Sequence, residues 1–261
     1  MTKIRRLFGY AVLGSAVLGG AVLALSIAVA TDVQAQSVGF GGSPGSFTTF
    51  NFPIISPQFS RHVLQMSPDR NKPANRNNGA QPARGSQSDL VVGHDATVSA
   101  RARQAFLDDI RRGESNGLTR QIELSMQQRD VRSQFGEAIS PYGLRPDNLA
   151  DVCAAYYAAM WMTANRAPLP TRSQVQALSR QIDGAFLAGA TQLDAAQRQQ
   201  GAEEIMYKTV WLIHLRQEAQ RLADQQAQQQ LADVTWQAFK RDQALDLRAT
   251  RLTDAGLVAN Q

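Results

Sequence analysis

The chain has 261 residues, with 27 Lys and Arg against 22 Asp and Glu, which gives a formal net charge of +5. This charge is too close to balance for the concentrated basic surface of a nucleic-acid-binding protein, so we expect no nucleic-acid partner. Because Cys153 is the only cysteine, no intramolecular disulfide can form and the fold must depend on its hydrophobic core.

The N-terminus has the order of an export signal. Three basic residues within the first six precede an uncharged stretch over residues 7–31 that is rich in Ala, Val, Leu and Gly, and this order is typical of a secretory signal peptide. We expect cleavage after Ala35, which would leave a periplasmic or extracellular protein. The apolar run is also long enough to span a bilayer. An uncleaved N-terminal anchor is therefore the alternative, and it would be the protein's only contact with the membrane.

Residues 36–89 are rich in Gly, Ser, Pro, Asn and Gln. Prolines at this density remove backbone donors and interrupt periodic patterns, which predicts a low-complexity, mostly disordered linker. An aromatic cluster between residues 40 and 59 is unusual for such a linker, and it could dock onto the folded domain or onto a partner. We favour a short extended segment that covers the domain's own surface.

From residue 90 to residue 261 the apolar residues recur at three- and four-residue spacing, which predicts helices. The expected helices lie near 96–112, 119–139, 146–165, 171–189, 194–223 and 231–239. We find no strand-turn-strand pattern and no internal repeat. The sequence therefore predicts an all-α fold, a single helical domain of about five or six helices behind the signal peptide and the linker.

The helix expected over 146–165 is apolar around a wide arc and rich in alanine. A helix of this kind is packed on more than one side, so we place it at the centre of the domain. Two of the later helices have the start signal of a capping box. The pairs are Thr171 with Gln174 and Asp194 with Gln197.

The sequence contains no pattern typical of a metal or nucleophile site. The three histidines lack the spacing of a metal-binding pair, so we expect no metal and no cofactor. His214 precedes Glu218 by one helical turn, but we interpret the two as a structural pair. Cys153 lies in the apolar stripe of the central helix and is interpreted as a core residue. The sequence favours a non-enzymatic protein, and we assign no catalytic residue.

Glu203 and Glu204 are the carboxylates most suggestive of hydrolysis, since paired acids cleave glycosidic bonds and an exported protein can meet cell-wall glycans. Adjacent helical residues point about 100° apart, however, so the two would not face one substrate. Glu204 also has Lys208 one turn later, which predicts a surface ion pair. Tyr157 and Trp161 could line an apolar ligand pocket, although aromatic residues at helical spacing are more typical of a core.

Several short segments resemble a family of uncharacterised exported bacterial proteins with a C-terminal helical domain of unknown function. They are Pro141–Leu144, Asn148–Asp151, Ala154–Ala158, Trp161, Asn165, Gln200–Glu203 and Leu252–Gly256. The resemblance implies a helical domain behind a signal peptide and a variable linker. It brings no reaction, ligand or catalytic residue. From the residues themselves, the candidate binding residues are Tyr157, Trp161, Asn165 and Glu203.

Three functions are left open. The first is a non-enzymatic binding or structural module of the cell envelope, whose domain binds an envelope protein or a small ligand and whose linker gives it reach. The second is a hydrolase that acts on an envelope polymer, with a Glu as general acid. The third is a membrane-anchored component of an assembly, which applies if the apolar N-terminus is retained.

Overall fold

The computed structural model describes residues 55–66, 90–113, 123–124, 126, 129–187 and 193–260. Most of these residues are helical, so the predicted all-α class is confirmed. The helices are α1 Pro57–Gln65, α2 Ala96–Gly113, α4 Val131–Ile139, α5 Leu149–Ala164, α6 Arg172–Leu187, α7 Ala195–Arg221 and α8 Gln225–Gln243. The described residues also form two short 3₁₀ helices, Ser140–Tyr142 and Leu247–Ala249, and two strands, β1 Thr250–Thr253 and β2 Gly256–Ala259.

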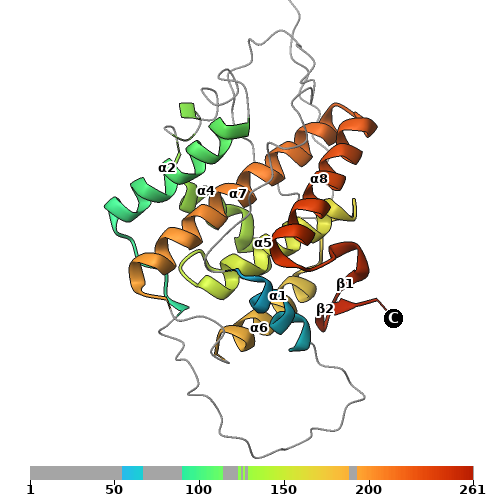
Figure 1. Ribbon diagram of the computed structural model, residues 1–261, viewed down its shortest axis with the longest axis horizontal. Coiled ribbons are helices and arrows are strands. Elements are labelled where there is room, and N and C mark those ends of the chain that lie inside the picture. The colour runs from blue at the N-terminus through green and yellow to red at the C-terminus, as the bar shows by residue number, and fades with distance from the viewer. Residues whose placement is uncertain are drawn as a thin grey trace, which may run out of the picture.

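The helix α5 is the centre of the domain, as predicted. It packs against α6, α7 and α8, while α7 also carries α2 and α4 on its other sides (Figure 1). Every residue of α5 except Trp161 is buried. The helix begins at Leu149, three residues later than expected, because the Asn148 side chain accepts a hydrogen bond of 3.0 Å from the Asp151 amide and so caps it.

Both predicted capping boxes are present. Before α6, the Thr171 hydroxyl accepts from the Gln174 amide at 3.2 Å and the Gln174 side chain accepts from the Thr171 amide at 2.9 Å. Asp194 and Gln197 make the equivalent pair before α7. The Gln-rich stretch at 225–230 is the start of α8, which therefore begins before the helix expected over 231–239. Asp224 caps this helix by accepting from the Ala227 amide at 2.9 Å.

The strands β1 and β2 form an antiparallel hairpin that the sequence analysis did not predict. Leu252 pairs with Leu257, and both are buried. The hairpin packs on α6, where the Gln181 side chain accepts from the Leu257 amide at 2.8 Å. Strands of four residues are too short to show a clear alternation of apolar and polar positions, so the pattern gave no signal.

The prediction of a disordered linker is wrong for residues 55–66, which include α1. Ser56 caps this helix by accepting from the Phe59 amide at 3.1 Å, and Pro57 occupies its first turn, where a missing N–H does no harm. Ile55, Phe59 and Val63 are buried in the main core. The C-terminal end of the predicted aromatic segment, Ile55 to Phe59, thus packs on the domain and leads into a helix, where we expected an extended chain. The remainder of residues 36–89 lies outside the described residues.

Among the helices that the structure describes, none is both long and apolar enough to cross a membrane. The predicted signal peptide, residues 1–35, lies outside the described part of the chain.

Candidate functional site

Glu203 lies at the buried end of a polar cluster between α2, α4 and α7. Its Oε1 accepts hydrogen bonds from Arg132 Nη2 at 2.8 Å, from Ser99 Oγ at 2.9 Å and from Gln199 Nε2 at 3.1 Å. The Glu203 side chain is 3% exposed and the Arg132 side chain 12% exposed. We name this group the Glu203 cluster, and its members are Gly93, Asp95, Ser99, Arg132, Gln199 and Glu203.

The start of α2 is held in the cluster through Asp95. The Asp95 carboxylate accepts from the amides of Thr97 and Val98 and so caps α2. Gln199 on α7 binds the backbone of the same residue twice, because its Oε1 accepts from the Asp95 amide at 2.8 Å and its Nε2 donates to the Asp95 carbonyl at 2.7 Å. The backbone of residue 95 is therefore fixed against α7.

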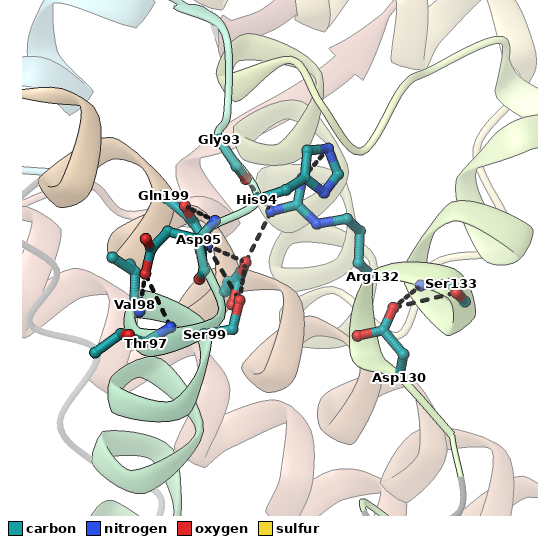
Figure 2. Close-up of polar contacts among 11 residues, drawn as sticks. Gly93, His94, Asp95, Thr97, Val98, Ser99, Asp130, Arg132, Ser133 and Gln199 are labelled. Carbon is teal, nitrogen blue, oxygen red and sulfur yellow. Dashed lines mark hydrogen bonds and ion pairs between the residues drawn. The ribbon is translucent and has the colours of Figure 1, made fainter.

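Arg132 joins α4 to the same place. Asp130 caps α4 by accepting from the Ser133 amide at 2.8 Å, which puts Arg132 in the first turn of the helix. Figure 2 shows its side chain extending from α4 toward the segment that begins α2, where Nη2 donates to the Gly93 carbonyl at 2.7 Å. One guanidinium thus contacts α7 through Glu203 and the chain before α2 through Gly93.

This geometry is poorly suited to acid catalysis. A general acid or base must come within hydrogen-bond reach of the substrate. All three donors converge on Oε1 of Glu203, and the side chain is almost fully buried. The arrangement neutralises a buried charge and connects three segments, which is a structural role.

Glu204, the neighbouring acid, faces a different environment. It accepts a hydrogen bond of 3.0 Å from Gln200, and burial raises its pKa although nearby Lys208 acts in the opposite direction. Lys208 Nζ lies 2.8 Å from an Asp109 carboxylate oxygen on α2. Lys208 was expected on the surface of α7, but its side chain is only 9% exposed and it connects α7 to α2 through Asp109.

Tyr157 and Trp161 lie on α5, Asn165 is the C-cap of this helix, and all three face other parts of the fold. The Tyr157 hydroxyl is 2.7 Å from the Ser60 hydroxyl of α1, and Tyr157 is fully buried. Trp161 Nε1 donates to the Thr250 carbonyl at 3.2 Å, and Asn165 Nδ2 donates to the carbonyls of Trp161 and Leu247. The structure does not bring these three residues together with Glu203.

His214 is half-buried, and Cys153 is fully buried. The His214 ring lies 5.5 Å from the Trp211 ring, and burial lowers its pKa although Glu218 acts in the opposite direction. Glu218 accepts from Arg221 Nε at 3.0 Å. Cys153 is fully buried, as expected of a core residue, and burial raises the pKa of its thiol far above the usual value. Over the described ranges, no group of His, Cys, Asp or Glu is arranged to hold a metal ion.

Arg132 and Ser99 were not identified from the sequence. They lie 71 and 104 residues from Glu203 in the chain, and no local motif links such distant positions. The cap at Asp95 was the nearest available signal, since an Asp just before a helical pattern is typical of a helix start.

No family model, curated protein or solved structure matches this chain. The resemblance to a family of exported helical proteins therefore stays a prediction.

Proposed function

We propose that the chain is an exported, non-enzymatic binding or structural module of the cell envelope. In this proposal, the helical domain acts as a rigid body and the N-terminal region carries it into the periplasm or the extracellular space. The expected partner is an envelope protein or a small ligand.

One observation carries the non-enzymatic part of the proposal. Glu203, the acid that a hydrolase would most plausibly use, has its Oε1 occupied by three donors and is 3% exposed. Its companion Glu204 points elsewhere on α7 and accepts from Gln200. Two carboxylates that act on one glycosidic bond must flank it. Glu203 and Glu204 contact different side chains and do not face a common substrate position. The pair therefore supports a structural role over a hydrolytic one.

The function is tested first by recovery of partners from envelope extract. The chain from Gln36 onward is immobilised and compared with the same chain carrying Phe59→Ala, which removes a buried contact between α1 and the core. We expect a saturable partner to bind the unsubstituted chain. Recovery of envelope material by neither chain would contradict the binding function.

The chain from Gln36 onward also tests the alternative of a hydrolase. Purified peptidoglycan is incubated with the chain, and released fragments are measured. Under the proposal none is released. Release that disappears in Glu203→Gln, while that variant stays folded by circular dichroism, would replace the proposal with the hydrolase function.

Export is tested separately by cell fractionation and by determination of the first residue of the mature protein. Gln36 at the N-terminus of a protein outside the cytoplasm is the expected result. Recovery in the cytoplasm with residues 1–35 intact would refute this part of the proposal.

A further inference from the structure

A small cavity lies between the end of α5, the second half of α7 and the first half of α8. Its volume is about 80 Å³, and its lining includes Thr163, Arg166, Arg216 and Leu231. A single water needs about 10–15 Å³ of such space. The cavity therefore has room for a group of several non-hydrogen atoms.

Two arginines line this cavity, and no carboxylate among the described residues forms an ion pair with either of them. Arg216 is half-buried, and its Nη1 and Nη2 donate to the carbonyls of Met162 and Ala167 at 2.8 and 2.6 Å. Arg166 donates to the neutral side chains of Gln225 and Gln229. Among the described residues, no carboxylate thus offsets the positive charge of either guanidinium beside the cavity.

The hydroxyl of Thr163 provides a second, independent observation. Thr163 is 3% exposed and lines the cavity, and its Oγ1 has no hydrogen-bond partner among the described residues. Thr209, also buried in a helix, shows the usual arrangement, since its Oγ1 donates to the Ile205 carbonyl at 2.7 Å. A buried hydroxyl without a partner is costly. Because this oxygen is almost fully covered, it would meet a molecule in the cavity only after the Thr163 side chain rotates toward it.

We propose that this cavity binds a small carboxylate. The two arginines supply positive charge, and the planar guanidinium matches the geometry of a carboxylate. Rotation of the Thr163 side chain would add a hydroxyl donor. Ala219 and Leu231 add apolar lining that suits a short alkyl group next to the carboxylate. The inference goes beyond the proposed function and does not depend on whether the chain is exported.

The test uses the full chain and propionate as the probe. Thermal unfolding is followed with increasing sodium propionate and, in parallel, with sodium chloride at the same ionic strength. Because a ligand that binds the folded state raises the melting temperature, propionate should raise it further than chloride does. An equal effect of the two salts would mean that the cavity holds only water, and this would overturn the proposal.

Three variants test whether the effect comes from this cavity. Arg166→Gln replaces an exposed side chain and should weaken propionate binding at least about tenfold. Thr163→Val, which keeps the shape of the side chain, should weaken binding about fivefold. Thr209→Val is the matched control and should bind propionate as the unsubstituted chain does. Unchanged binding in both Arg166→Gln and Thr163→Val would place propionate elsewhere and overturn the proposal.

The two threonine variants also differ in their stability without ligand. Thr163→Val should unfold at the same temperature as the unsubstituted chain or higher, because its hydroxyl has no partner among the described residues. Thr209→Val should unfold at a lower temperature, because a hydrogen bond is lost. A loss of stability in Thr163→Val as large as that in Thr209→Val would show that the Thr163 hydroxyl is already satisfied, and this would overturn the proposal.

Discussion

Replacement of Glu203 by Gln removes one buried charge and very little else. The amide oxygen of Gln can still accept the three hydrogen bonds that converge on Oε1. The change therefore leaves Arg132 with acceptors but without its counter-charge. It separates the role of charge in the Glu203 cluster from the role of hydrogen bonding.

The expected loss of stability follows from the burial of the two partners. Breaking a buried ion pair by removing one partner costs about 3–5 kcal/mol. The Arg132 side chain is 12% exposed and also donates to the Gly93 carbonyl, so part of its charge stays solvated. We therefore expect Glu203→Gln to lower the free energy of unfolding by about 2–3 kcal/mol.

Removing the other partner should cost more. Arg132→Met leaves the Glu203 carboxylate, 3% exposed, without a cation, and we expect a loss of about 3–5 kcal/mol. The double variant should be less destabilised than the sum of the two, with a coupling energy of about 1–3 kcal/mol.

Glu204→Gln is the control, because it makes the same chemical change at the next residue of α7. Burial raises the pKa of Glu204, so the charged form is disfavoured in the folded state. Its neutralisation should cost little or should stabilise the protein slightly. Urea unfolding monitored by circular dichroism gives all of these values. A loss in Glu203→Gln no larger than in Glu204→Gln would refute the structural role of the cluster.

Three further changes test other parts of the fold, each by urea unfolding. Phe59→Ala should cost about 3–4 kcal/mol, because the ring is 1% exposed and packs 4.5 Å from the Phe186 ring; a loss below about 1 kcal/mol would show that α1 is not part of the core. Ala244→Gly should raise the free energy of unfolding by about 1 kcal/mol, because Ala244 has a left-handed φ of 50° and its exposed methyl group makes no core contact. The same change at exposed Ala100, inside α2, should lower the free energy of unfolding by about 1 kcal/mol. An equal effect at both sites would contradict the reasoning. Burial lowers the pKa of His214 below 6.5, so the unfolded state binds more protons in the range below that value and stability is lost as the pH falls through it; His214→Gln should reduce this loss, and an unchanged pH dependence would contradict it.

The helical class and the central position of α5 could be predicted because both depend on local patterns. An apolar arc that covers most of a helix indicates burial on several sides, whatever the neighbours are. The capping boxes at Thr171 and Asp194 were equally accessible, since each is a pairing between residues three apart. Local patterns failed where an element is short. The four-residue strands at 250–253 and 256–259 carry too few positions for a periodicity to emerge. The helix α1 was missed for another reason, because Ile55, Phe59 and Val63 recur at four-residue spacing but lie within a region whose Gly, Ser and Pro content predicts disorder.

The same distinction explains why Glu203 was noticed and its role was not. An acid next to another acid is visible in the sequence, but the partner that determines what it can do lies 71 residues away. Burial and a guanidinium decide whether a carboxylate acts as an acid or holds helices together, and neither is encoded beside Glu203 in the chain. In a helical domain, side chains that face between helices meet partners from distant segments as a rule. A polar residue on a predicted inner face is therefore better interpreted as one half of an ion pair or hydrogen bond, with its partner in a distant segment, than as a catalytic group.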